Sequence, residues 1–272
     1  MFNFIHNFSP SPILVDFGFV QIHWYGLFIA LAIVFAWLLF SYLAKWNAWD
    51  KKTTENVILS WLIGAVLGAR IYYIVYAWQF YREDCLSIFK IWEGGLAIHG
   101  ALIGGFVALL IYCRIKKVAV LPWLDIFAVV LPLSQAIGRW GNYFNQEIFG
   151  KPTTLPWGIP ITLDKRPEAY LLDNYFHPTF LYESLLNLIL FALLFFLWRK
   201  WSAKNPGSIF LLYLAVYSLI RFLMEFLRTD YSPELFGIRW AQGLSGMLVI
   251  VVVFIILFKF KEIVLRCWTK GK

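Results

Sequence analysis

Charged side chains interrupt the long apolar stretches of this chain, and they are the residues most able to do chemistry. They are Arg70, His99, Asp125, Glu183, Arg221 and Glu225, with Arg139, Glu147 and Arg228 at the ends of such stretches. A charged group at membrane depth costs about 2.5–3.5 kcal/mol on insertion scales, so such residues are candidates for function. Because the guanidinium group is a planar fork of donors that suits phosphate, the set indicates chemistry on an anionic group.

The segment 138–150 crowds polar side chains among glycines at the edge of an apolar stretch. Arg139, Asn142 and Asn145 recur at intervals of three and would share one face of a helix. The alternative is a solvated helix end. Packing alone hardly explains so many polar groups at lipid depth, so we favour a functional role for this segment.

A second set follows in the sixth apolar stretch. Tyr217, Arg221, Glu225 and Arg228 fall at i, i+4, i+8 and i+11, which places them on one stripe of a helix. Arg221 and Glu225 can pair within that helix. A structural ion pair that locks the helices together is a serious alternative for Glu225, and a weaker one for Tyr217 and Arg228.

His99 lies among glycines in the third apolar stretch. The glycines allow a neighbouring helix or a lipid to approach the backbone closely, and this favours a functional histidine. The alternative is a packing histidine that hydrogen-bonds across helices. The carboxylates and histidines show no spacing typical of metal ligands, so we expect no metal and no other cofactor.

The composition places these residues in a membrane protein. Of 272 residues, 61% are hydrophobic and 15% are charged, against roughly half and a quarter in ordinary soluble domains. A soluble fold could not bury so much apolar surface, so the solvent is lipid. The net charge of +8 is explained by Lys and Arg in short loops, where they orient a membrane protein. We therefore expect no nucleic-acid partner.

Seven apolar stretches approach the length of about 20 residues with which a helix crosses the hydrocarbon. They lie near residues 22–44, 55–77, 94–113, 119–137, 178–198, 207–227 and 241–259. The chain is therefore predicted to be all-α, a polytopic membrane protein with about seven transmembrane helices in one domain, residues 1–272.

Positive charge is divided unequally between the two sets of loops. Fourteen Lys and Arg lie on the set that includes the C-terminal residues, eight lie on the other set, and residues 1–21 hold none. Because cytoplasmic loops carry the excess of positive charge, the N-terminus is predicted outside and the C-terminus in the cytoplasm. The longest connection, about 138–177, is then on the outer, periplasmic side, where its length suggests a function.

Four motifs together resemble the prolipoprotein diacylglyceryl transferase family. They are His99-Gly-Ala-Leu-Ile-Gly, Gly138-Arg-Trp-Gly-Asn-Tyr-Phe-Asn-Gln-Glu-Ile-Phe-Gly150, His177-Pro-Thr-Phe-Leu-Tyr-Glu and Arg221-Phe-Leu-Met-Glu-Phe-Leu-Arg228. The resemblance runs from about Gln21 to Ser245. Ala101 stands where the family usually has a second glycine, and Phe180 stands where a more polar residue is expected.

This resemblance implies a multi-pass enzyme of the bacterial inner membrane that acts in lipoprotein biosynthesis. Such a transferase moves the diacylglyceryl group of phosphatidylglycerol to the lipobox cysteine thiol of a prolipoprotein signal peptide and releases glycerol phosphate. Its partners are therefore phosphatidylglycerol, prolipoproteins and membrane lipid. The nucleophile is the substrate's own thiol, so none of Cys85, Cys113 and Cys267 is needed.

The resemblance also carries the family's roles to particular residues. The catalytic residues are then His99, Arg139, Arg221 and Tyr217. The substrate-binding residues are Tyr25, Asn142, Glu147, Gly150 and Glu225, and we add Arg228 from its place on the stripe. In this hypothesis the two catalytic arginines clamp the leaving phosphate, and His99 takes the thiol proton because imidazole titrates near neutrality. Tyr217 is the alternative proton carrier.

Three other functions account for parts of the sequence but not for all of it. An anion transporter would also use intramembrane arginine and glutamate, but internal repeats are expected there and none is found. An intramembrane serine protease is suggested by Gly243-Leu-Ser-Gly246, yet all four histidines precede Ser245, whereas in rhomboids the histidine follows the serine. A structural scaffold would leave the arginine-rich cluster unexplained.

Overall fold

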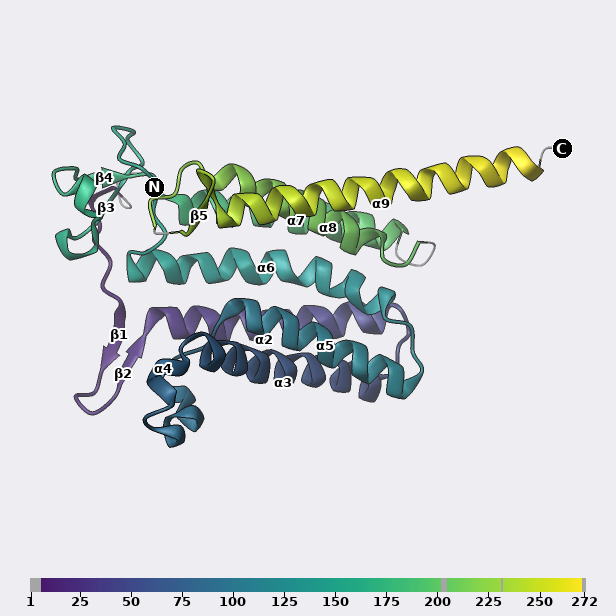
Figure 1. The fold of residues 1–272 in the computed structure, drawn as a ribbon, viewed down its shortest axis with the longest axis horizontal. Helices are drawn as coiled ribbons and strands as arrows, with labels where there is room; N and C mark the ends of the chain where they lie inside the picture. The colour runs from purple at the N-terminus through teal and green to yellow at the C-terminus, as the bar shows by residue number, and fades with distance from the viewer. Residues whose placement is uncertain (1–5, 202–204, 231, 271–272) are drawn as a thin grey trace. The chain divides into compact units, whose positions relative to one another are not determined.

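The computed structural model describes residues 6–201, 205–230 and 232–270. Its contacts divide the chain into two compact units. Unit 1 takes the residues up to Ala36 and those from Asp125 onwards, and unit 2 takes Trp37–Leu124. Figure 1 shows the order of the elements along the chain. Each unit is considered by itself below.

Among the described residues, five helices are long and apolar enough to cross a membrane. They are α2 (Trp24–Trp46), α3 (Lys51–Tyr76), α5 (Ile98–Lys116), α6 (Leu121–Asn145) and α7 (Thr179–Trp201). Two more apolar helices are α8 (Ser208–Met224) and α9 (Trp240–Lys270), whose apolar part is Trp240–Ile255. Each of the seven predicted stretches overlaps one of these helices, which confirms a mostly helical, polytopic membrane protein.

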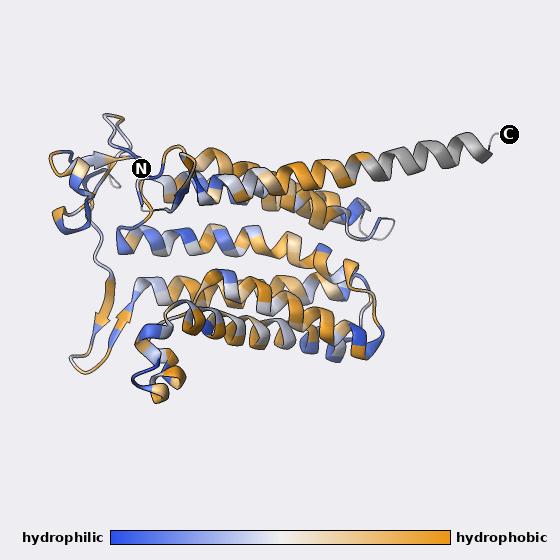
Figure 2. Cartoon of the chain, viewed as in Figure 1, coloured by the Kyte–Doolittle hydropathy of each residue, from blue (hydrophilic) through white to orange (hydrophobic). Residues whose placement is uncertain are grey.

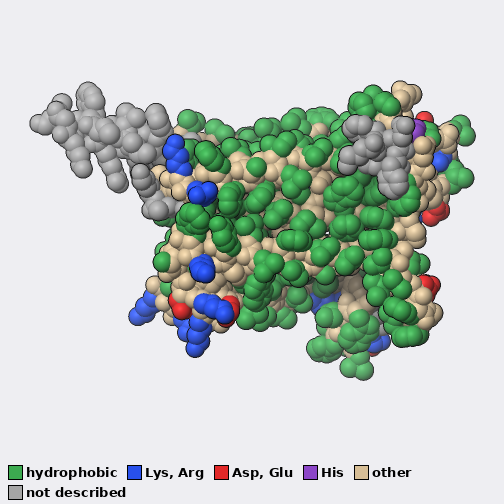
Figure 3. All heavy atoms as spheres, turned by 180° about the vertical axis from the view of Figure 1, so that it is seen from behind, with side chains coloured by type: hydrophobic (Ala, Val, Ile, Leu, Met, Phe, Trp, Pro, Cys, Tyr) green, Lys and Arg blue, Asp and Glu red, His purple; other side chains and the backbone are tan. Residues whose placement is uncertain are grey.

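The surfaces of the helices are apolar, as a lipid solvent requires. Figure 2 shows hydrophobic residues along much of the coloured length of the helices and hydrophilic residues near many of the helix ends. Hydrophobic side chains also cover most of the face seen in Figure 3. Val75 and Ile250, for example, are 72% and 71% exposed. Such exposure would be costly in water and is unremarkable in lipid.

In unit 2, α3 and α5 pack backbone against backbone. A Cβ atom added to Gly68 would overlap the carbonyl oxygen of Gly100, and one added to Gly104 would overlap that of Gly64. Each helix thus presents a pair of glycines four residues apart, the small-residue spacing that allows close approach of membrane helices. The glycines that follow His99 therefore serve helix packing.

Arg70 of α3 organises the short elements that follow it in unit 2, namely α4 (Trp78–Tyr81), η1 (Cys85–Phe89) and η2 (Ile91–Glu93). Its Nε donates to Ile88 O at 2.9 Å, and its two terminal nitrogens donate to Ser87 O at 2.7 Å and Gly94 O at 2.6 Å. The guanidinium also lies over the ring of Tyr81. This intramembrane charge is structural.

In unit 1, α7 packs against α8 and α8 against α9. Asp125 of α6 fixes the start of α8, because its carboxylate accepts hydrogen bonds from Gly207 N at 2.7 Å and Phe210 N at 2.9 Å. These amides are orphan donors at the first turn of a helix, and a carboxylate there satisfies them. Asp125, 0% exposed, is thus a second structural charge.

Short antiparallel pairs accompany the helices of unit 1. They are β1 (Ile13–Asp16) with β2 (Gln21–His23), β3 (Ile159–Pro160) with β4 (Tyr175–Phe176), and β5 (Glu234–Leu235) with β6 (Ile238–Arg239). In register, Asp16 lies opposite Gln21, Ile159 opposite Phe176, and Glu234 opposite Arg239.

The connection between α6 and α7 is shorter than predicted, because α6 continues to Asn145. The connection contains β3, β4 and two single-turn helices, η3 (Leu163–Lys165) and η4 (Glu168–Tyr170). It packs onto the helices through a buried apolar cluster. The cluster consists of Tyr143, Phe149, Ile159, Ile161, Phe176 and Phe180. This core holds the connection over the end of α6, where the polar residues of the segment 138–150 lie.

Candidate active site

Glu183 links two arginines from distant parts of the chain. The carboxylate projects from α7, where its side chain is only 3% exposed, and forms an ion pair with Arg139 of α6. Its other oxygen lies 3.6 Å from Nη1 of Arg228, which follows α8. A buried carboxylate is stable only when it is paired. Glu183 therefore holds both guanidinium groups at one end of unit 1.

Glu225 gathers three more ion pairs within the same unit. Its side chain is 0% exposed and pairs with Arg221. Arg239 Nε lies 3.1 Å from one carboxylate oxygen, and Arg228 Nε lies 4.0 Å from the other. Arg228 therefore belongs to both groups of ion pairs, so that Arg139 and Arg221 are connected through Glu183, Arg228 and Glu225.

The predicted stripe on one helix is only partly correct. α8 ends at Met224, and Glu225 is its C-cap. Tyr217 and Arg221 are therefore helical, whereas Arg228 lies beyond the helix in an extended segment. The chain turns here because Glu225 N and Phe226 N bond the carbonyls of Arg221 and Leu223 at the helix end.

Gly150 holds this extended segment in place. Its backbone pairs with that of Arg228 as an antiparallel bridge, and Lys151 N donates to Leu227 O at 2.8 Å. A Cβ atom at Gly150 would lie 2.7 Å from the Cβ of His177 and 3.2 Å from Leu227 O. The glycine is needed because three backbones meet at this point. It therefore positions the segment that carries Arg228, and its part in substrate binding stays a prediction.

Asn142 connects Arg139 to Glu147. Arg139 Nη1 donates to Asn142 Oδ1 at 3.2 Å, and Asn142 Nδ2 donates to Glu147 Oε1 at 2.7 Å. This confirms the predicted shared helix face of Arg139 and Asn142. Glu147 sits between Gln146 and Ile148, whose φ angles are 52° and 57°. Two non-glycine residues in the left-handed region are costly, and such strain is typical of functional sites.

Gln146, which is not among the predicted site residues, fixes the strained turn. Its Nε2 donates to Pro10 O at 2.9 Å, and its Oε1 accepts from Thr162 N at 2.8 Å. The side chain is 7% exposed, so both hydrogen bonds are sheltered from solvent. The turn that carries Glu147 is thus tied to both the N-terminal segment and the α6–α7 connection.

The two predicted tyrosines lie in unit 1 as well. The ring of Tyr25 packs against the backbone of Gly141, one turn of α6 before the site, and the tyrosine interacts electrostatically with Glu147 and Arg139. Tyr217 stacks on Tyr213 with ring centroids 5.4 Å apart. It also interacts electrostatically with Arg221, one turn further along α8.

The ion-paired side chains carry a small excess of positive charge. Arg139, Arg221, Arg228 and Arg239 face Glu183, Glu225 and Asp230, so four positive charges meet three negative ones. Burial alone would raise the pKa of Asp230, but the hydrogen bonds and charge of Arg228 outweigh burial and hold the pKa below its usual value. Asp230 therefore stays ionised near neutral pH, and the guanidinium groups of this network can form charge-assisted hydrogen bonds with an anionic ligand.

His99 belongs to unit 2, where it lies in the first turn of α5 and is exposed. The centroid of its ring is 6.1 Å from that of Tyr72. The glycine cluster that favoured a catalytic role is explained by the packing of α3 on α5. The role of His99 as a base stays a prediction.

Three polar residues outside the predicted set are part of the site or support it. Arg239 and Asp230 are ion-paired within it, and Glu183, which interrupts the fifth apolar stretch, pairs with Arg139 and Arg228. His177 forms a second polar contact near α7, with its Nδ1 3.2 Å from Tyr182 Oη, which also accepts from Trp157 Nε1 at 2.8 Å. Burial lowers the pKa of His177, so its imidazole is neutral at physiological pH.

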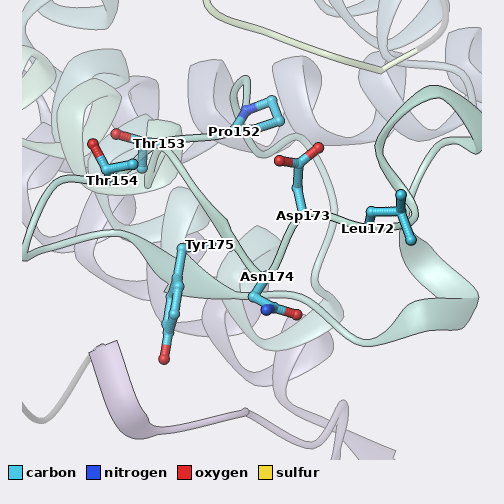
Figure 4. Close-up of a pocket in the computed structure, with 7 residues that line it drawn as sticks. All are labelled: Pro152, Thr153, Thr154, Leu172, Asp173, Asn174 and Tyr175. Atoms are coloured by element: carbon cyan, nitrogen blue, oxygen red, sulfur yellow. The ribbon is translucent and has the colours of Figure 1, made fainter.

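The α6–α7 connection also contains an open hollow of about 590 Å³, shown in Figure 4. It is lined by Pro152, Thr153, Thr154, Leu172, Asp173, Asn174 and Tyr175. One of the seven is a carboxylate and the others are uncharged, so the hollow does not suit a phosphate. Within the described ranges, no group of three or more His, Cys, Asp or Glu could hold a metal ion.

Comparisons with known proteins agree with the motifs. A family model described as prolipoprotein diacylglyceryl transferase matches residues 12–258. Curated proteins with the name phosphatidylglycerol–prolipoprotein diacylglyceryl transferase are similar over most of their length. The one from Nostoc sp. is 46% identical over 241 residues, 87% of this chain and 85% of its own. The one from Parasynechococcus marenigrum is 41% identical over 255 residues, 89% of this chain and 91% of its own. The range matched by the family model includes every residue of the predicted site.

Proposed function

This chain belongs to the prolipoprotein diacylglyceryl transferase family, and from that premise we infer that it transfers the diacylglyceryl group of phosphatidylglycerol to a cysteine thiol of a prolipoprotein. The product that leaves is glycerol phosphate. We propose that the thiol is that of the lipobox cysteine. The observation that supports a site in unit 1 is the pair of buried carboxylates, Glu183 and Glu225, that connect Arg139 with Arg221.

The proposed reaction is a displacement at the glycerol carbon that bears the phosphate. A sulfur lone pair forms the new S–C bond, and the electrons of the C–O bond leave with the phosphate ester. Negative charge therefore grows on the phosphate oxygens in the transition state. Arg139 and Arg221 would stabilise that charge, because guanidinium groups held in place before the reaction pay no cost of reorganisation during it.

Neutral and acidic groups beside Arg139 would orient the glycerol head of the lipid. Asn142 and Glu147 form one hydrogen-bonded row with Arg139, and hydroxyl groups of glycerol could replace one of these hydrogen bonds. Tyr25 lies next to this row and is 38% exposed, which suits a contact with lipid. Arg228 would hold the row of ion pairs together and contribute positive charge.

The first experiment is a transfer assay with purified protein, phosphatidylglycerol vesicles and a lipobox peptide. Mass spectrometry should detect a peptide that has gained one diacylglyceryl group, and a peptide with serine in place of cysteine should gain none. Arg139→Ala and Arg221→Ala should each lower kcat/KM by about 1,000-fold or more while the protein stays folded.

Arg166→Ala is the matched control for loss of an arginine. Arg166 lies in the α6–α7 connection and donates to the carbonyls of Ile161 and Leu171, so the control should keep nearly full activity. An unmodified peptide with wild-type protein would refute the function. Full activity in both arginine variants would refute the phosphate clamp.

We propose His99 as the group that takes the thiol proton. A free thiol has a pKa of about 8.5, so a modest base suffices near neutral pH. His99→Gln should lower the rate at neutral pH by about 100-fold, and the rate should recover as the pH rises and the thiolate forms unaided. If His99→Gln had the rate and the pH profile of wild type, His99 would not be the base, and Tyr217 would be the alternative acceptor of the thiol proton.

We also propose that the enzyme lies in the bacterial inner membrane as a single domain, with its N-terminus and the α6–α7 connection outside and its C-terminus in the cytoplasm. The unequal division of Lys and Arg supports this orientation. Cys85 offers a test, because it is an exposed free thiol on the proposed outer side. In a variant with Cys113 and Cys267 replaced by serine, a membrane-impermeant maleimide should label Cys85 of this protein in intact cells. Labelling only after cell lysis would indicate the opposite orientation.

A further inference from the structure

Arg239 contacts both a carboxylate and backbone carbonyls of unit 1, although no motif indicated it. It ends β6, where it lies opposite Glu234 in the β5–β6 hairpin. Its Nε lies 3.1 Å from Glu225 Oε1. Its Nη1 donates to Glu225 O at 3.1 Å and to Arg228 O at 3.0 Å, and its Nη2 donates to Asp230 O. One guanidinium thus contacts one buried carboxylate and three backbone carbonyls.

These carbonyls belong to the chain just after α8. The last carbonyls of a helix lack intrahelical partners and carry partial negative charge, which a nearby cation satisfies. Arg239 donates to the carbonyl of Glu225 at the end of α8. It also donates to two carbonyls further along the chain, those of Arg228 and Asp230. It therefore fixes the backbone on which Arg228 is placed.

The second effect of Arg239 is on charge. Glu225 is fully buried and pairs with Arg221. Arg228 Nε also lies 4.0 Å from this carboxylate, but Arg228 is shared with Glu183 and Asp230, so without Arg239 the charge of Glu225 would largely neutralise Arg221 and weaken its attraction for a phosphate. Arg239 supplies a further positive charge to the same carboxylate. The Arg221 side chain is 21% exposed, whereas that of Arg228 is 6% and that of Arg239 is 14% exposed, so Arg221 is the most accessible of the three to a ligand.

We propose that Arg239 is a positioning residue for the phosphate site. It compensates the charge of Glu225 so that Arg221 can bind a lipid phosphate, and it fixes the turn that carries Arg228. This proposal rests on the proposed function and deepens it, because it identifies which charge leaves Arg221 available to the phosphate of phosphatidylglycerol.

The test measures steady-state kinetics of full-length Arg239→Gln and Arg239→Lys with phosphatidylglycerol vesicles and a lipobox peptide. Arg239→Gln should raise KM for phosphatidylglycerol by about 10-fold or more, and KM for the peptide should change by less than about 2-fold. Arg239→Lys should fall between wild type and Arg239→Gln, because it keeps the charge but cannot reach three carbonyls with a planar fork. Arg166→Gln is the matched control and should leave both KM values unchanged.

A double variant separates charge compensation from mere packing. When Glu225→Gln is added to Arg239→Gln, the carboxylate that would capture Arg221 is gone. KM for phosphatidylglycerol in the double variant should therefore be lower than in Arg239→Gln alone. Equal or additive defects would overturn the charge argument.

Other outcomes remain informative. If Arg239→Gln is not monodisperse in detergent, Arg239→Lys with and without Glu225→Gln answers the same question. Active wild-type enzyme together with an unchanged KM for phosphatidylglycerol in both Arg239 variants would overturn this inference and leave the proposed function standing. An inactive wild-type enzyme would refute the proposed function itself.

Discussion

Buried or largely buried arginines occur in both units, and their partners differ. Arg70 in unit 2 uses all five of its N–H groups on the backbone carbonyls of Ser87, Ile88, Lys90, Gly94 and Gly95. Arg139 and Arg221 in unit 1 pair with carboxylates that other arginines share. Each arginine lies within or beside an apolar stretch, so the sequence pattern alone treats them alike.

The difference shows what makes an intramembrane arginine available for function. A guanidinium has five donors, and Arg70 has none left for a ligand. A carboxylate shared by several arginines can lose one partner without being left as an unpaired charge. Arg139 and Arg221 can therefore exchange a carboxylate contact for a phosphate contact, whereas Arg70 holds the 85–95 segment in place.

The largest effect that tests this comparison is expected at Glu183. In Glu183→Gln, Arg139 and Arg228 lose the charge that holds them together, and kcat/KM should fall by about 100-fold or more. The measurement is the initial rate of peptide lipidation by folded protein. Glu168→Gln is the control, because Glu168 is exposed in the α6–α7 connection, and it should keep wild-type rates. A fully active Glu183→Gln would show that the shared carboxylate does not organise the site.

A smaller effect, on stability, is expected at Arg70. Arg70→Gln leaves several partly buried carbonyls without donors, which should lower the free energy of unfolding by about 2–4 kcal/mol. Thermal unfolding in detergent at a fixed scan rate measures it. Arg82→Gln should have little effect, because the Arg82 side chain is 62% exposed. If Arg70→Gln unfolded like wild type while activity was lost, the contrast between the two units would be wrong.

The smallest effect concerns pH and Asp230. Its pKa is lowered in the folded protein from the ordinary value of 3.8. Its ionised carboxylate therefore stabilises the fold fully above that ordinary value, and the stabilisation is lost as the pH falls through the lowered pKa. Between about pH 6 and pH 3 the unfolding temperature of wild type should fall by about 2–4 °C more than that of Asp230→Asn. Parallel pH profiles would show that Arg228 does not depend on this carboxylate.

The helices could be predicted from the sequence because lipid imposes length and hydropathy on every span. The predicted helix stopped near residue 137 because Gly138–Asn145 contains an arginine, two asparagines and two glycines. Hydropathy cannot distinguish such a helix end from a loop. It extended α8 to residue 227, although the helix ends at Met224. The prediction that Arg228 lies on the helical stripe is therefore wrong. Its position is set by a backbone bridge to Gly150.

Candidate residues were predicted where chemistry and local spacing coincide. The row Arg139, Asn142 and Glu147 lies within one segment, and its hydrogen bonds follow from helical spacing and one turn. Arg239 gave no such signal, because its partners lie up to 14 residues away and the intervening hairpin brings them together. Glu183 stands out in the sequence as a charge within an apolar stretch, but its partners on two other elements cannot be read from spacing.

The carboxylate of Asp125 has a consequence for the biosynthesis of the chain. Two of its hydrogen-bond donors, Gly207 N and Phe210 N, lie 82 and 85 positions later in the sequence, so neither has been synthesised when α6 leaves the ribosome. Hydrogen bonds lower the cost of a carboxylate near hydrocarbon, and these two form only once the start of α8 exists. The contact between α6 and the start of α8 is therefore completed only after α8 has been translated.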